Sequence, residues 1–192
     1  MRLHHYLPLF LTSVASLTAA APAPTNDLAV RDGSEVVAAV NTIAEQTKTL
    51  NETVSSYDGG IVDTVTAIEI ETQAIELNND LRKAIWVTQN SDNFTTAESK
   101  AVSTAFLEMV PVVESTLANI VSKEEEFSNG LLGIWSLGFL VKYNLETEKR
   151  LALELGHEVE KRLTPVYAEI APIVISQIKT AFTKAIEAYS DN

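Results

Sequence analysis

The sequence from Ser34 to Gly60 reads SEVVAAVNTIAEQTKTLNETVSSYDGG, and its apolar residues recur at intervals of three or four. This spacing places them on one face of an α-helix, which must be buried against neighbouring helices. Thr47 alone interrupts the stripe, and Gly59 and Gly60 predict a helix end and a turn. The stripe consists of Val36, Val40, Ile43, Leu50, Val54 and Tyr57.

Two further helices follow from the same spacing. The segment 61–89 carries two apolar stripes, so we expect it to contact neighbours on more than one side. Thr95 or Thr96, with Glu98 close behind, offers an N-cap for a third helix that closes at Asn129 and Gly130. The two stripes of 61–89 are Ile61, Val65, Ile68, Ile75 and Ile70, Leu77, Leu81, Ile85.

A fourth helical pattern begins at Leu131 and continues to Leu163, and a fifth opens at Thr164 and Pro165. Two prolines fall inside these patterns. Pro111 predicts a kink or a local break near Glu108 in the third helix, and Pro172 a bend in the fifth.

These segments predict an all-α fold, an antiparallel bundle of about five long helices with short connections. No stretch alternates with a period of two over a useful length, so strands are not supported. The bundle domain is expected to cover residues 34–190 and to form one core.

The amino-terminal residues 1–20 have the pattern of a secretory signal peptide, with Arg2, an apolar run and the small residues Ala19 and Ala20 before the expected cleavage point. Residues 21–33 read as a flexible leader or a short pro-segment, in which Arg31 is a weak processing candidate. The predicted location is therefore secreted, in the extracellular region, the cell wall or both. The segment ending at Asn192 has no apolar tail, which argues against a GPI anchor.

The formal net charge is −12, and removal of residues 1–20 would make it one unit more negative because Arg2 is lost. Phosphate polymers would be repelled, so nucleic-acid binding is not expected. The chain has no cysteine and hence no disulfide or thiolate metal site. Two sequons make Asn51 and Asn93 candidates for N-glycosylation.

An enzyme is not predicted. His157 is the only histidine after residue 20, and a lone helical histidine is more often solvated or packed than catalytic. The carboxylates lack the partner spacing of a di-metal bundle site, and phosphate loops, nucleophile elbows and zinc spacings are absent from the sequence. We therefore expect no cofactor, no metal ion and no catalytic residue.

The stretch from Gly130 to Leu145 is apolar in every direction around a helix and too short to span a bilayer. Gly133 and Gly138 each disfavour a helix by about 1 kcal/mol relative to alanine, so close packing or a ligand must offset them. The stretch is either a central buried helix or a contact for a lipid or hydrophobic surface. The candidates for the second role are Trp86, Phe106, Met109, Trp135, Phe139, Leu140 and Tyr143.

Four local patterns add to this layout: Val54-Ser-Ser-Tyr57 before a glycine turn, Phe127 before a glycine-rich restart, Leu140-Val-Lys-Tyr-Asn-Leu145, and Phe182-Thr-Lys-Ala-Ile-Glu-Ala-Tyr-Ser190. With the signal peptide and the absence of cysteine, they resemble the fungal hydrophobic surface-binding protein A family, which includes the cell-wall galactomannoproteins. The resemblance covers about residues 34–190.

The resemblance implies a secreted or wall-associated helical protein that adsorbs to hydrophobic surfaces and, in some members, holds a fatty acid between its helices. Some members recruit a secreted polyester hydrolase, and cell-wall polysaccharide is a further implied partner. The alternative is a structural, glycosylated wall mannoprotein or antigen without a small-molecule ligand. No family motif assigns individual ligand residues.

Overall fold

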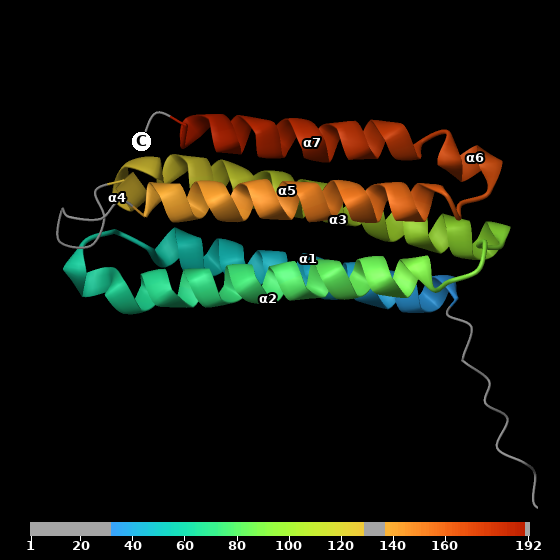
Figure 1. The fold of residues 1–192 in the computed structure, drawn as a ribbon, viewed down its shortest axis with the longest axis horizontal. Coiled ribbons are helices and arrows are strands. Elements are labelled where there is room, and N and C mark those ends of the chain that lie inside the picture. The colour runs from blue at the N-terminus through green and yellow to red at the C-terminus, as the bar shows by residue number, and fades with distance from the viewer. Residues whose placement is uncertain (1–31, 129–136, 191–192) are drawn as a thin grey trace, which may run out of the picture.

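The computed structural model describes residues 32–128 and 137–190. The predicted signal peptide, nearly all of the predicted leader, and Trp135 lie outside these residues. Five long helices make up most of the described chain (Figure 1). They are α1 (Gly33–Ser56), α2 (Thr64–Gln89), α3 (Thr96–Ser122), α5 (Gly138–Glu160) and α7 (Ala171–Ala188).

Three short elements complete the fold: the 3-10 turn η1 (Ile61–Asp63), α4 (Glu124–Ser128) and α6 (Pro165–Ala168). Within 32–128 and 137–190 there is no β-strand. The predicted all-α bundle of about five long helices is confirmed.

The long helices form a closed ring in the order α1, α2, α5, α7, α3, and each packs against two others. Helices that follow one another in sequence run antiparallel because their connections are short (Figure 1). Five helices in a ring cannot all alternate in direction. With this ring order, the parallel neighbours are α1 and α3, α3 and α7, and α2 and α5. A ring of this kind encloses an interior that all five helices line.

Helix α1 buries the stripe that its sequence predicts. Val36, Val40 and Val54 are fully buried, and Thr47 is buried among them. The Thr47 hydroxyl donates to the Ile43 carbonyl oxygen at 2.7 Å, so the one polar residue of the stripe has its hydrogen bond satisfied inside the helix. The predicted N-cap of α3 is also confirmed, since Thr95 and Glu98 form a reciprocal capping box.

Only one of the two apolar stripes on α2 is buried. Ile70, Leu77, Leu81 and Ile85 face the ring interior, whereas Ile61, Val65, Ile68 and Ile75 are exposed. Helix α2 contacts α1 on one side and α5 on the other, as its two stripes predict. The exposed stripe remains an apolar outer face.

The proline positions and helix ends depart from the sequence prediction in two places. The sequence predicts a kink or a local break near Glu108, and α3 continues through Pro111 without a break. The helix ends at Ser122 instead of near Asn129, and α4 follows after Lys123. The fifth helix is interrupted at Glu169 and Ile170, just before Pro172, and so becomes α6 and α7. Pro172 lacks the amide that would bond the carbonyl of Ala168, which explains an interruption one turn earlier.

Among the described residues, α5 begins at Gly138, with Leu137 at its N-cap; the predicted start at Leu131 falls outside them. The residues between 129 and 136 lie outside the described part of the chain. Among the described helices, α3 has the length and apolar composition of a membrane span. Because α3 packs between α1 and α7 and buries Val102, Phe106 and Leu117, this composition is that of a core helix.

Candidate apolar ligand site

A small cavity of about 40 Å³ lies in the middle of the ring and is lined by all five long helices. A second cavity of about 30 Å³ adjoins it toward the α4 end. Leu50, Ile120 and Glu148 border both cavities. The remaining walls of the central cavity are Ile43, Thr47, Leu77, Leu81, Met109, Val113, Thr116, Leu117, Ala152, Ile178 and Phe182.

A larger apolar pocket of about 240 Å³ lies at the opposite end, where α3, α5 and the α6–α7 segment meet. Exposed residues such as Leu107 and Ile170 line it, so it reaches the surface, and Lys100 stands at its rim. Lys100 has no ion pair within the described residues. The inner wall of this end pocket is made of Phe106, Gly156, Val159, Leu163 and Val174.

The end pocket and the central cavity follow one another along the bundle axis. On α3 Phe106 borders the pocket and Met109 the cavity, and on α7 Val174 borders the pocket and Ile178 the cavity. Each step is one helical turn, which is about 5 Å. The three voids therefore form an interrupted apolar track through the ring, beginning at the α6 end.

The other end of the ring is closed by aromatic side chains. The rings of Tyr57 and Phe127 stack with centroids 4.6 Å apart, and Tyr189 lies 6.3 Å from Phe127. The Tyr189 hydroxyl donates to the Ile120 carbonyl oxygen at 2.6 Å. Burial raises the pKa of both tyrosines, with smaller contributions from Asp63 of η1 at Tyr57 and from carboxylates of α4 at both. This aromatic plug makes the α6 end the open one.

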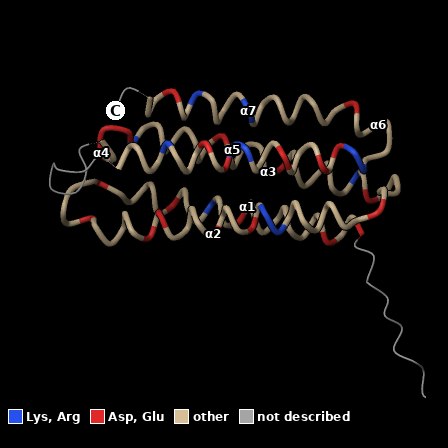
Figure 2. The backbone as a smooth tube through the Cα atoms, viewed as in Figure 1, with Lys and Arg blue, Asp and Glu red and all other residues tan. Residues whose placement is uncertain are grey.

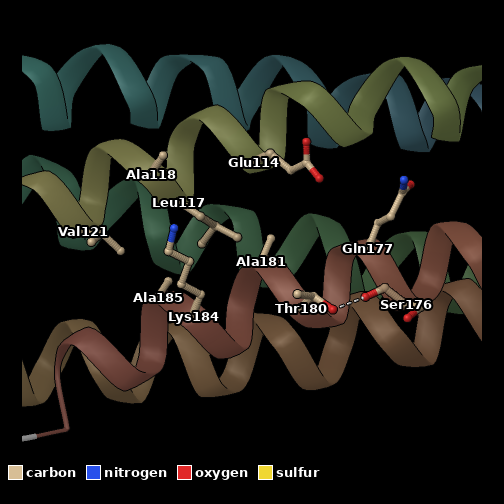
Figure 3. A pocket seen from close by; sticks show the side chains of 10 residues that line it. All are labelled: Glu114, Leu117, Ala118, Val121, Ser176, Gln177, Thr180, Ala181, Lys184 and Ala185. Atoms are coloured by element: carbon tan, nitrogen blue, oxygen red, sulfur yellow. Dashed lines mark hydrogen bonds between the residues drawn. The ribbon is translucent and has the colours of Figure 1, made fainter.

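A hollow of about 490 Å³ is a groove on the outer surface between α3 and α7 (Figure 3). Glu114, Gln177 and Lys184 contribute polar groups to it, and the Thr180 hydroxyl bonds the Ser176 carbonyl oxygen at 2.8 Å. Small residues such as Ala118 and Ala181 form much of the rest. Because its rim is polar and it lies outside the ring, we consider the end pocket the better site for an apolar ligand.

Glu148 is an ionisable side chain in a mostly apolar interior. It is 4% exposed, and burial together with the charge of Glu71 raises its pKa to about 8. It is the only titratable residue among those that line the two interior cavities. At neutral pH the folded chain therefore carries a mostly protonated carboxyl in its core.

The residues singled out in the sequence do not come together in one place. Phe106 lines the end pocket and Met109 the central cavity. Trp86, Phe139 and Tyr143 are 52%, 73% and 58% exposed on the outer surfaces of α2 and α5, and Leu140 is half-buried on α5. Trp135 lies outside the described residues.

The sequence reading missed Glu148 and the pocket residues of the α6–α7 segment. Glu148 lies in the same register as Leu145, Ala152 and Leu155, which would have marked it as a core position. Leu163 and Ile170 fall on the apolar stripes of the fourth and fifth predicted helices, but nothing in the sequence marks them or Tyr167 as pocket residues, because the pocket depends on the interruption before Pro172.

The described residues hold no cluster with the composition of a metal site. The His157 imidazole is exposed, with its Nδ1 3.3 Å from Glu160 Oε2, on the surface of α5.

The family model for hydrophobic surface binding protein A matches residues 33–161, which cover four of the five ring helices. The chain belongs to this family. Among curated proteins it is similar to cell wall mannoprotein 1 of Aspergillus flavus, with 23% identity over 94% of this chain, and to cell wall mannoprotein 1 of Aspergillus fumigatus, with 24% identity over 91%. The chain spans only 62% and 57% of the length of these two relatives.

Solved structures share the fold. The crystal structure of AFMP4P in complex with palmitic acid superimposes with a TM-score of 0.77 at 21% identity, covering 83% of this chain and all of that one. Ligand binding domain 1 of the Penicillium marneffei MP1 protein, complexed with arachidonic acids, gives 0.74 at 18% identity over 82% of this chain and 99% of its own. Ligand binding domain 2 of the same protein, complexed with multiple arachidonic acids, superimposes with a TM-score of 0.75 at 18% identity. The match covers 85% of this chain and 99% of that domain.

Proposed function

We propose that this chain binds the hydrocarbon chain of a fatty acid or related lipid inside the helix ring and takes it up through the end pocket. The observation that carries this proposal is the alignment of the apolar pocket with the two interior cavities. The fatty acids held by the structural neighbours named above support it. Each methylene group removed from water contributes about 0.8 kcal/mol, so a long chain gains much by entering.

The interior cavities are too small to hold a hydrocarbon chain as they stand. Uptake therefore requires the helices around the track to move apart, with the ligand filling the space that opens. Met109 at the central cavity has a flexible side chain that suits a wall of changing shape.

A tryptophan placed in the pocket tests the proposal. Ser103 is half-buried and lines the end pocket, so Ser103→Trp should fill it and weaken palmitic acid binding at least about tenfold. Thr180→Trp, in the outer groove of Figure 3, is the matched control and should bind as the unmodified protein does. Calorimetric titration gives both affinities, and an equal affinity for the two variants would contradict uptake through this pocket.

Adsorption to an uncharged hydrophobic surface is a second candidate, favoured by the exposed stripe of η1 and α2. Val62 is 92% and Val65 75% exposed, and Ile68 continues the stripe. Acidic residues are spread over the helices, with fewer basic residues among them (Figure 2), and the net charge of −12 disfavours an anionic lipid surface. The matching surface is therefore neutral and apolar.

Replacing Val62, Val65 and Ile68 by serine should abolish adsorption to polystyrene beads without changing the helix content. Serine at Val166, Ile170 and Ile173, the exposed apolar residues near the end pocket, is the control and should leave adsorption unchanged. Loss of adsorption in the control alone would place the adsorbing face at the α6 end instead.

We further infer a noncatalytic, extracellular role, in the cell wall or the surrounding medium. The signal-peptide pattern of residues 1–20 and the wall mannoprotein relatives support this location. A purely structural wall mannoprotein is the alternative, and it predicts no saturable fatty-acid binding. A secreted polyester hydrolase and wall polysaccharide remain proposed partners, which co-precipitation from culture medium and binding to isolated walls would test.

Of the two sequons, we propose Asn93 as the glycan acceptor. Asn93 is exposed in the α2–α3 connection, whereas Asn51 is half-buried within α1 and its Oδ1 accepts a hydrogen bond from Asn119 at 2.9 Å. Asn93→Gln should remove the glycan mass of protein from a secreting eukaryotic host, and Asn51→Gln should not. A mass loss only in the second variant would reverse the assignment.

A further inference from the structure

The Glu148 side chain is buried, with 4% of its surface exposed, and no hydrogen bond to a described residue involves its carboxyl. Its oxygens are not among the fully enclosed, unpartnered polar atoms, so they face accessible space. Buried polar groups in folded proteins nearly always have a hydrogen-bond partner, and a water or a ligand supplies it where the protein does not. Glu148 borders both interior cavities, so the space for that partner is beside it.

No positive charge from the surrounding helices neutralises Glu148. The cavity walls contributed by α1, α3 and α7 contain no titratable residue. On α2, Glu71 adds a second negative charge, and its Oε2 accepts a hydrogen bond from Asn144 Nδ2 at 2.7 Å. On α5 itself, the neighbouring Lys149 ammonium bonds Thr183 Oγ1 of α7 at 2.7 Å. A ligand carboxylate placed here would meet two carboxyl groups and no cation.

The path from Glu148 to the end pocket is apolar. Along α5 it passes Ala152 and Leu155 to Val159, a distance of about 16 Å at 1.5 Å per residue. On α7 Ile178 and Val174 lie along the same direction. A hydrocarbon tail suits this path, and a polar head suits only its inner end.

We propose that Glu148 hydrogen-bonds the uncharged polar head of an acyl-chain ligand, whose tail then runs toward the end pocket. A neutral carboxyl both donates and accepts, so it matches the hydroxyl of a long-chain alcohol or the protonated carboxyl of a fatty acid. The site thereby selects an uncharged head over a carboxylate. This inference rests on the proposed function, because it assigns the position and charge of the ligand that the ring takes up.

The test compares 1-dodecanol with dodecane, which differ in the hydroxyl alone and do not titrate. Both are delivered from cyclodextrin complexes to the folded chain and to the variants Glu148→Gln and Glu148→Leu, and bound ligand is quantified at pH 6 and pH 9. The Glu148→Gln variant keeps the hydrogen-bonding shape without a titratable group, and Glu148→Leu removes the polar group. Far-UV circular dichroism confirms that each variant is folded.

At pH 6 the unmodified protein should prefer dodecanol, and Glu148→Leu should reduce the preference about tenfold, the value of one buried hydrogen bond. At pH 9 the ionised Glu148 carboxylate can still accept a hydrogen bond from the dodecanol hydroxyl, so the unmodified protein should keep its preference for dodecanol, as should Glu148→Gln. An unchanged preference in Glu148→Leu, or no preference for dodecanol over dodecane in the unmodified protein at either pH, would overturn the inference.

Palmitic acid separates this inference from the proposed function. If the head group stays at the pocket mouth, Lys100→Gln will weaken palmitate binding while the Glu148 variants leave it unchanged, and only the present inference is refuted. If the unmodified protein binds none of dodecanol, dodecane and palmitic acid at either pH, and the variants also bind none, the proposed uptake itself is refuted.

Discussion

At the scale of single residues, Glu148 makes folding depend on pH. Burial, with a smaller contribution from Glu71, raises its pKa in the folded protein from the ordinary 4.5 to about 8. Below pH 4.5 both folded and unfolded chains keep the proton. Between 4.5 and 8 the unfolded chain ionises first, so the free energy of unfolding falls as the pH rises, and above 8 this loss is complete.

Glu148→Gln should remove this dependence. The free energy of unfolding of the unmodified protein, measured by urea titration relative to the variant, is expected to fall by about 3 to 4 kcal/mol between pH 5 and pH 9. Hydrogen bonds, chiefly to Thr95 and Lys161, lower the pKa values of Glu98 and Glu158. These two groups therefore raise the free energy of unfolding as the pH rises, and the comparison with the variant cancels their contribution. A constant difference between the two proteins would show that Glu148 ionises freely in the fold.

The aromatic plug offers a matched pair of hydroxyl groups. Tyr189 donates to the Ile120 carbonyl oxygen at 2.6 Å, whereas the buried Tyr57 hydroxyl has no hydrogen-bond partner among the described residues. Tyr189→Phe should therefore lower the free energy of unfolding by about 1 kcal/mol, and Tyr57→Phe should leave it unchanged or raise it slightly. Urea midpoints measure both, and an equal loss in the two variants would mean that the Tyr57 hydroxyl also has a partner, such as a water.

At the scale of the helices, Pro111 is a local cost inside α3. Its ring leaves the Leu107 carbonyl without the usual amide partner, and its side chain is exposed, so alanine fits without repacking. Pro111→Ala should raise the free energy of unfolding by about 1 to 3 kcal/mol. Pro172→Ala is the control, because a proline in the first turn of α7 removes no hydrogen bond within α7, and with α6 and α7 already separate its replacement should change little. Thermal unfolding distinguishes the two.

The helices themselves were predictable from periodicity, because each buries one stripe of apolar residues spaced by three or four. Two features were not. On α2 both stripes are similarly apolar in sequence, and only the packing of α1 and α5 decides that Ile70 and Leu77 are buried while Val65 and Ile68 are exposed. The sequence also made Trp86 and Phe139 candidates for a lipid or hydrophobic-surface contact without showing which, and in the structure both are exposed on the outside of the ring.

Three of the sequence patterns that indicate the family contribute residues that meet in the folded structure, which the sequence alone does not show. Tyr57, Phe127 and Tyr189 come from three distant patterns and meet in the aromatic plug. The candidate site, in contrast, required tertiary structure, since residues of α3, α5, α6 and α7 form the end pocket together. The sequence could identify Glu148 only as a core position. That its carboxyl lacks a hydrogen-bond partner among the described residues is evident only from the structure.

At the scale of the whole molecule, the two ends of the ring differ, and this asymmetry predicts where it opens. The α4 end is closed by the plug, so uptake should separate α5 from α7 at the end pocket. These helices approach closely there, because a Cβ on Gly156 would lie 2.8 Å from Ile175 Cγ1. Cysteines at 156 and 175 are therefore near the Cβ separation of about 3.5–4.5 Å that a disulfide needs.

A Gly156→Cys, Ile175→Cys variant should fold and, when oxidised, gain up to about 3 kcal/mol of stability while losing at least about tenfold in palmitic acid affinity. The chain has no other cysteine, so the same sample after reduction is the control for the altered side chains. Recovery of binding on reduction is expected, since the helices can then separate. Equal binding by the oxidised and reduced forms would show that the ligand enters without moving α5 from α7, and the opening would have to lie between another pair of neighbours in the ring.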